Sequence, residues 1–137
     1  METAEKSIIR RFYEITNAGR PEDLDEVCAP DLKGYAGAGA DLAELKSSIA
    51  GFLAPFPDLH AELRHVVQED DLVSVWVSYT GTHRGDFAGV PATDRRLKFA
   101  AWDLFRVRDG KVVELTQYCD VFTILSQIGA LATAAPA

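Results

Sequence analysis

The sequence lacks the cysteine and histidine patterns that would indicate a metal site or a disulfide-bonded protein. Its two cysteines, Cys28 and Cys119, form no CxxC motif and show no Cys/His spacing typical of zinc ligands. Neither a disulfide scaffold nor a zinc site is therefore predicted, and we expect two buried free thiols. The three histidines show no HxH or HxxxH spacing, so we predict no metal site of any kind.

Cofactor motifs are missing as well. The chain contains no GxGxxG, no GxxxxGK[ST] and no GxSxG sequence. These motifs supply the phosphate-binding turns of nucleotide and flavin sites and the nucleophilic serine of many hydrolases. We therefore predict a function that uses no bound cofactor.

An excess of basic residues is also absent. The chain carries 14 Lys and Arg against 21 Asp and Glu, a net charge of −7. This charge opposes binding to nucleic acid or to an anionic membrane surface, so we expect neither partner. No stretch of about 18 apolar residues occurs, and the acidic start is not followed by the apolar stretch of a signal peptide. We expect a cytoplasmic protein.

What is present is the composition of one globular domain. The 137 residues are 47% hydrophobic and 26% charged, and a chain of about this length forms one hydrophobic core. We predict a single domain over residues 1–130. The alanine-rich end, residues 131–137, is predicted to be a flexible tail.

The spacing of apolar residues changes from helical to alternating after Asp58. The expected helices cover residues 5–17, 21–28 and 41–53, with a closing helical turn after 121. The expected strands cover residues 32–35, 59–69, 72–83, 97–108 and 111–119. Helices followed by consecutive antiparallel strands predict an α+β fold, with a curved sheet wrapped around the N-terminal helices and a hydrophobic pocket on its concave side.

One carboxylate stands out within the strands. Asp103 shares a strand face with apolar neighbours such as Phe99 and Phe105. Burial disfavours the charged form of a carboxyl group and raises its pKa, which suits a general acid or base near neutral pH. A position at the rim of the sheet, or a pairing with a cation, is the alternative for this residue.

A second carboxylate ends the following strand. Asp109-Gly110 is a hairpin turn signal, and pairing across that turn places Asp120 near Phe99. We therefore expect Asp103 and Asp120 to flank one pocket without touching. Capping of the following helix is an alternative role for Asp120, and a single β-bulge would reverse the assigned face.

Other candidates are a histidine and several aromatic residues. His83, at the end of a strand, is either a catalyst or a hydrogen-bonded core histidine. Aromatic residues occur in every element, so some must line the cavity, and Phe52 and Tyr79 belong to this set. The predicted substrate-binding residues are Tyr13, Tyr35, Trp76, Phe87, Trp102 and Tyr118.

Short motifs along nearly the whole chain carry a family resemblance. They are residues 11–14 (RFYE), 17–19 (NAG), 56–59 (FPDL), 81–87 (GTHRGDF), 89–93 (GVPAT), 103–106 (DLFR), 109–114 (DGKVVE), 120–121 (DV) and 127–129 (QIG). In this order they resemble the SnoaL-like polyketide cyclase family of the nuclear-transport-factor-two-like superfamily.

The resemblance implies a cone-shaped α+β barrel, dimeric or larger, with a cavity for an aromatic polyketide of anthracycline-type antibiotic biosynthesis. It implies that Asp120 matches the family aspartate that acts as general acid/base in an intramolecular aldol ring closure, without cofactor or metal. Supporting roles for Asp103 and His83 are also implied.

The sequence departs from the family near this site and leaves other functions open. Leu115-Thr116 stands where many members have His-Trp. Some relatives of the cyclases are associated with hydroxylation in anthracycline tailoring, so oxygen insertion is an alternative. A non-catalytic binding module is a further one. Epoxide hydrolysis is less favoured, because Ala101 stands where the epoxide hydrolase pattern has an arginine.

Overall fold

The computed structural model describes residues 2–131 and confirms the α+β fold. Most of the predicted tail, residues 132–137, lies outside the described residues. The elements are α1 (Ala4–Asn17), the 3-10 helix η1 (Pro21–Glu26), β1 (Cys28–Ala36), α2 (Leu42–Leu53), β2 (His60–Glu69), β3 (Leu72–Thr82), β4 (Arg96–Arg108), β5 (Lys111–Cys119) and α3 (Val121–Gln127).

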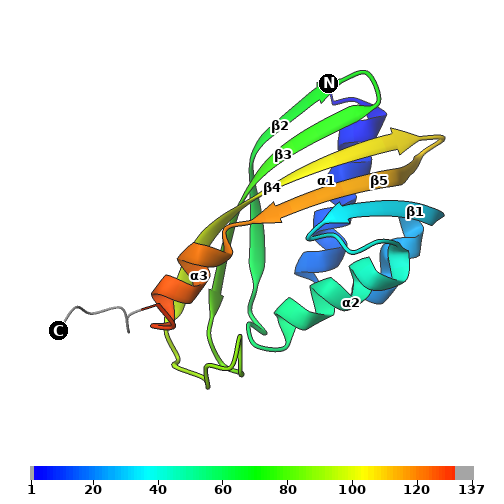
Figure 1. The fold of residues 1–137 in the computed structure, drawn as a ribbon. Helices are drawn as coiled ribbons and strands as arrows, with labels where there is room; N and C mark the ends of the chain where they lie inside the picture. Colours follow the sequence, from blue (N-terminus) through cyan, green and yellow to red (C-terminus); the bar gives the residue numbers. More distant parts are fainter. Residues whose placement is uncertain (1, 132–137) are drawn as a thin grey trace.

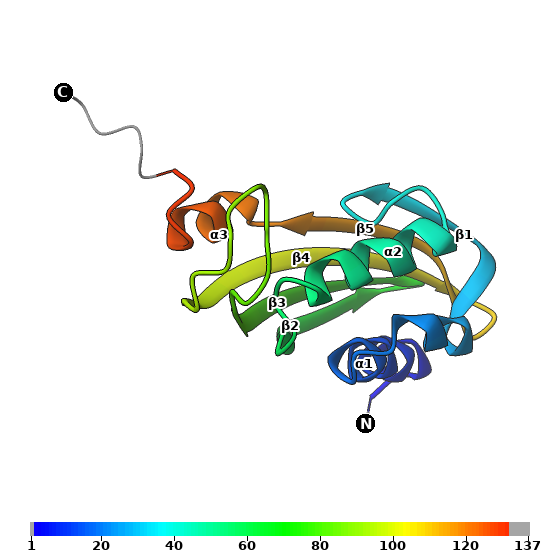
Figure 2. The same ribbon diagram turned by 90° about the horizontal axis from the view of Figure 1, so that it is seen from below.

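The five strands form one curved sheet in the order β1-β5-β4-β3-β2 (Figure 1). Strands β2 to β5 pair antiparallel, as predicted, whereas β1 joins the edge parallel to β5. Helices α1 and α2 lie on the same side of the sheet, and no helix covers the opposite face within the described residues (Figure 2). None of the helices in this part of the chain is long and apolar enough to cross a membrane.

Local sequence signals position the two covering helices. Thr3 caps α1 by accepting a hydrogen bond from the backbone N–H of Lys6 at 3.2 Å. At the other end, the Asn17 amide donates to the Ala61 carbonyl at 3.0 Å and accepts from the Ala61 N–H at 2.7 Å. This pair of bonds fixes the end of α1 against β2. Asp41 caps α2 in the same way as Thr3 caps α1.

The core occupies the space between the helices and the concave face. Every second residue of β4 from Leu97 to Val107 is buried, which confirms the predicted alternation. The aromatic rings of Phe12, Tyr13 and Phe105 pack edge-to-face at the centre. A smaller cluster forms under α3 around Phe56 and Ile124.

A β-bulge sets the register of the last hairpin. Val107 pairs with Val112, but Arg106 pairs with Glu114, so Val113 is an extra residue on β5. Beyond the bulge, Asp103 pairs with Gln117. This pairing is one residue away from the predicted register, and one residue exchanges the two faces of a strand.

Candidate functional site

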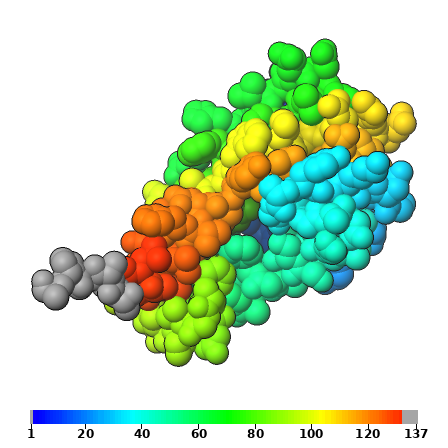
Figure 3. All heavy atoms as spheres, in the orientation of Figure 1, coloured from blue at the N-terminus to red at the C-terminus, as the bar shows by residue number. Residues whose placement is uncertain are grey.

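A cavity of about 310 Å³ lies between α1, α2 and the concave face of the sheet. Its wall is mainly apolar, and Figure 3 shows the surface hollowed between the β1–α2 and β5–α3 segments. Apart from the phenols of two tyrosines and one thiol, the polar lining side chains are Thr16, Asn17, Ser48, Asp103 and Gln117. Among the described residues, no lysine, arginine or histidine lines the cavity, so the site favours an uncharged ligand.

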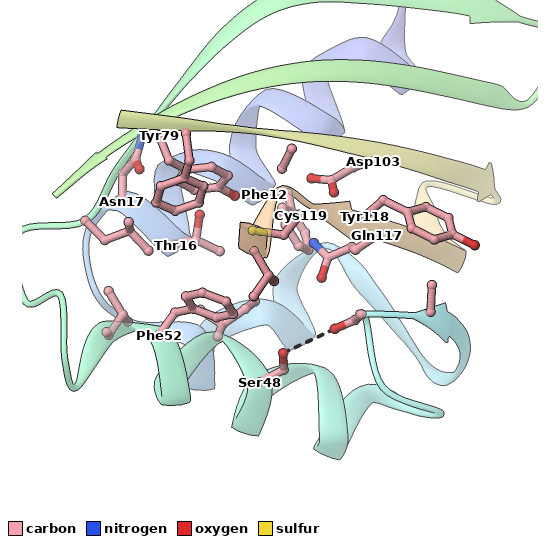
Figure 4. A pocket seen from close by; sticks show the side chains of 18 residues that line it. Phe12, Thr16, Asn17, Ser48, Phe52, Tyr79, Asp103, Gln117, Tyr118 and Cys119 are labelled. Atoms are coloured by element: carbon pink, nitrogen blue, oxygen red, sulfur yellow. Dashed lines mark hydrogen bonds between the residues drawn. The ribbon is translucent and has the colours of Figure 1, made fainter. Parts of the chain in front are cut away.

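Among residues 2–131, Asp103 is the one acidic side chain in this wall (Figure 4). It is 1% exposed, and the Tyr13 hydroxyl donates a hydrogen bond to its Oδ2. Burial raises the pKa of Asp103 to about 7, although the side chains of Tyr13 and Gln117 partly oppose that rise. Near neutral pH the group is therefore able both to accept and to donate a proton.

Two tyrosines flank Asp103 from different elements. Tyr13 comes from α1 and Tyr79 from β3, and burial together with the charge of Asp103 raises the pKa of both phenols. Tyr79 stacks on Phe99, with ring centroids 5.2 Å apart. Tyr79 lines the cavity, whereas Tyr13 does not. Both phenols therefore stay protonated near neutral pH.

Asp120 lies elsewhere, because of the register shift. Its carboxylate accepts hydrogen bonds from the Thr123 backbone N–H at 3.0 Å and from the Thr123 hydroxyl at 2.6 Å. These bonds hold the pKa of Asp120 below its usual value. Asp120 is exposed and is not among the cavity-lining residues. Asp120 instead lines a more open neighbouring pocket, which shares part of its lining with this cavity. The two aspartates therefore do not share one cavity wall, and the alternative role of Asp120 as a helix cap is confirmed.

His83 is also separated from the cavity. It is fully buried, and its Nδ1 accepts a hydrogen bond from the Thr93 backbone N–H at 3.3 Å. Its ring packs against Phe56, with centroids 5.7 Å apart. The structure thus does not bring His83 together with Asp103 at one site.

The predicted aromatic substrate contacts divide between the two faces of the sheet. Only Tyr118 of the six lines the cavity. Trp76 is half exposed on the uncovered face, and Trp102 stacks on Tyr118 with ring centroids 6.1 Å apart. These three residues line a second, more open pocket, and Tyr118 lies at the edge shared by the two pockets. Tyr35 is also half exposed and lies outside the wall. Strand alternation directs the side chains of Trp76 and Trp102 away from the concave face.

The remaining aromatic residues either line the cavity or pack beside it. Phe87 packs on Phe52 and Phe56 instead of reaching the cavity. Phe52 and Tyr79, which belonged to the wider aromatic set, do line it, and so does Phe12 from α1. The sequence predicted a helix that contains Phe12, but it did not predict that Phe12 lines the cavity.

Gln117 and Cys119 are site residues that sequence reasoning did not select. Both line the cavity beside Asp103. Burial raises the pKa of the Cys119 thiol to about 12, so it is protonated at neutral pH. The alternation of β5 already grouped these two residues on one face; only the bulge was needed to assign that face to the cavity. Within residues 2–131, no group of three or more His, Cys, Asp or Glu side chains is placed to hold a metal ion.

Comparisons with known proteins agree with this architecture. The chain is 25% identical over 134 residues to aklanonic acid methyl ester cyclase DnrD of Streptomyces peucetius, covering 89% of this chain and 88% of the relative. It is 33% identical to IdmH of Streptomyces antibioticus, a proposed polyketide cyclase, with a TM-score of 0.82 over 91% of this chain and 98% of that one.

A proposed hydroxylase has a similar fold. AclR of Streptomyces galilaeus is 27% identical, with a TM-score of 0.86 over 96% of this chain and 84% of that one. The family model for SnoaL-like polyketide cyclases matches residues 6–128. The chain therefore belongs to the SnoaL-like polyketide cyclase family.

Proposed function

We propose that this protein closes a ring in an aromatic polyketide of anthracycline type by an intramolecular aldol reaction, with Asp103 as general acid/base and without a bound cofactor. The supporting observation is Asp103 itself, a buried carboxyl group in the wall of an apolar cavity with a pKa of about 7. The similarity to an aklanonic acid methyl ester cyclase supports the substrate class.

In the proposed reaction, ionised Asp103 removes a proton from a carbon next to a carbonyl group. The electron pair of the broken C–H bond forms an enolate, whose carbon attacks a second carbonyl carbon of the same molecule. A C–C bond forms, and the second C=O becomes an alkoxide. Protonated Asp103 then returns its proton to that alkoxide, so the product is an isomer of the substrate and no oxidant or reductant is needed.

The cavity contributes by holding the two reacting carbons together. An apolar wall excludes water and confines a flexible keto-ester. The two reacting carbons are then held close together, which reduces the entropy cost of reaching the transition state. The described part of the chain contributes one buried carboxyl group and no basic side chain to the wall. The cavity therefore suits a neutral ester better than a free acid.

The central test is a pair of matched substitutions. Asp103→Asn should lower kcat by roughly 10²–10⁴-fold, the usual contribution of general acid–base catalysis. Asp120→Asn should leave turnover near the wild-type level, because asparagine also caps helices. The family resemblance assigns the acid/base role to Asp120, and the opposite pattern of activities would transfer the role to that residue.

Mass spectrometry of the products identifies the reaction. The purified protein is incubated with anthraquinone-type polyketide keto-esters, with and without oxygen. An isomeric product formed without oxygen supports the cyclase. A product heavier by one oxygen atom, formed only with oxygen, supports the alternative of a hydroxylase, which the similarity to AclR favours.

Tight binding without turnover of any keto-ester would indicate a non-catalytic binding module.

Further expectations depend on the family resemblance and on composition. A homodimer or higher oligomer is expected, and light scattering after gel filtration measures it. The net charge of −7 predicts a protein that binds neither nucleic acid nor anionic membranes.

A further inference from the structure

Tyr79 carries a hydroxyl group that the fold does not use. Within residues 2–131, its Oη has no hydrogen-bond partner, and no hydrogen bond contributes to its raised pKa. In the same part of the chain, the only fully enclosed side-chain nitrogen or oxygen without a partner is His83 Nε2. The Tyr79 hydroxyl is therefore accessible, and since Tyr79 lines the cavity, a ligand there reaches it.

The strand register directs this hydroxyl toward the carboxyl group. Tyr79 pairs with Phe99, and Asp103 lies four residues further along β4 on the same concave face. The side chains of Ala101 on β4 and Val77 on β3 stand between them on that face. In Figure 4 the phenol projects across the cavity wall on the side of Asp103. The charge of Asp103 also raises the pKa of Tyr79, as expected for near neighbours.

The other tyrosine differs in this respect. The Tyr13 hydroxyl already donates to Asp103, and Tyr13 is 2% exposed behind the cavity wall. One phenol thus holds the base, and the other is free to meet the ligand. A ligand carbonyl needs such a donor, because a buried oxyanion without a hydrogen bond is strongly disfavoured.

We propose that Tyr79 is a catalytic hydrogen-bond donor that binds the ligand carbonyl whose oxygen becomes the enolate oxygen. The role rests on the proposed aldol reaction. Tyr79 keeps its proton throughout, and Asp103 removes the proton from the neighbouring carbon. Because the donor is already oriented, it stabilises charge in the transition state more than in the ground state.

The carbonyl stretch of a bound ketone tests the donor directly. The probe is α-tetralone, an unreactive aromatic ketone, with its carbonyl labelled with ¹³C so that protein bands do not overlap. In the wild-type protein and in Tyr13→Phe, saturating probe should show a band at lower frequency than in hexane. In Tyr79→Phe that shift should be lost. No shift in the wild-type protein, or an unchanged shift in Tyr79→Phe, overturns the proposal.

Kinetics separate the two tyrosines a second time. Tyr79→Phe should lower kcat by roughly 10²-fold, as removal of one oxyanion donor does, with the acidic limb of the pH–rate profile in place. Tyr13→Phe should instead move that limb upward by about one pH unit, because Asp103 loses a hydrogen bond that lowers its pKa. Full kcat in Tyr79→Phe overturns the catalytic role.

The two readouts also distinguish failure of this proposal from failure of the proposed function. If the wild-type protein turns over no keto-ester but the carbonyl shift depends on Tyr79, the aldol reaction is wrong and Tyr79 stands only as a ligand contact. If turnover depends on Asp103 but neither readout depends on Tyr79, the donor role is wrong and the aldol reaction stands.

Discussion

The concave face and the far end of the β4–β5 hairpin give the same residue type opposite properties. On the concave face, burial raises the pKa of Asp103 to about 7. At the end of the hairpin, Asp120 is exposed, and hydrogen bonds from Thr123 lower its pKa. A carboxylate that already accepts two hydrogen bonds is a poor base, whereas a desolvated one is a better base. The environment of each aspartate therefore distinguishes a candidate catalyst from a helix cap.

The aromatic residues divide in the same way. Phe105 is fully buried between α1 and the sheet, whereas Trp76 is 50% exposed on the uncovered face. Strands β3 and β4 are neighbours, and these two side chains lie three register positions apart on opposite faces of the sheet. Aromatic content alone does not identify a cavity wall; the face decides it.

Replacing one aromatic residue on each face should give the largest contrast. Phe105→Ala should lower the free energy of unfolding by about 3–5 kcal/mol, because it leaves a void in the core. Trp76→Ala should lower it by about 1 kcal/mol or less, because much of that ring is already in water. Urea denaturation at pH 7 measures both, and equal losses would contradict the assigned faces.

The stability of the protein should depend on the ionisation of Asp103. Folding raises the pKa of this group from 3.8 to about 7, so the folded state holds a proton that the unfolded state releases. The contribution of Asp103 to the free energy of unfolding is therefore fully present below about pH 4 and is lost as the pH rises to about 7. Asp103→Asn has no such ionisation. The free energy of unfolding of the variant, relative to that of the wild-type protein, should therefore increase with pH by on the order of 4 kcal/mol.

Denaturation of both proteins at pH 5 and pH 8 measures that difference. The matched control is Asp120→Asn, which alters an exposed carboxylate whose pKa folding lowers. It should show no gain in stability at pH 8. A constant difference between Asp103→Asn and the wild-type protein at the two pH values would mean that Asp103 titrates normally.

The smallest effect is expected at the helix cap. Asp120→Ala removes the acceptor for the Thr123 N–H and should lower Tm slightly, whereas Asp120→Asn retains an acceptor and should restore most of that loss. Thermal unfolding followed by circular dichroism measures both. Identical Tm values for the alanine variant and the wild-type protein would show that α3 needs no cap.

Local patterns predicted much of the fold because they depend on side chains close in sequence. The spacing of Ile9 and Phe12 predicted the buried face of α1, and the alternation around Asp103 predicted its burial. The parallel pairing of β1 with β5 was not predicted, because its partners are far apart in the sequence. Of the residues that line the candidate site, the sequence analysis selected Asp103 but not Gln117.

The sequence by itself determined the α+β class, the positions of the four antiparallel strands and the apolar row in which Asp103 lies, because these follow from the periodicity of the chain. Only the tertiary structure decided which carboxylate meets the cavity. One extra residue, Val113, changes the register of β5 and places Gln117 opposite Asp103. The faces of a strand alternate with every residue, so a local pattern identifies two faces but long-range pairing determines which one lines the site.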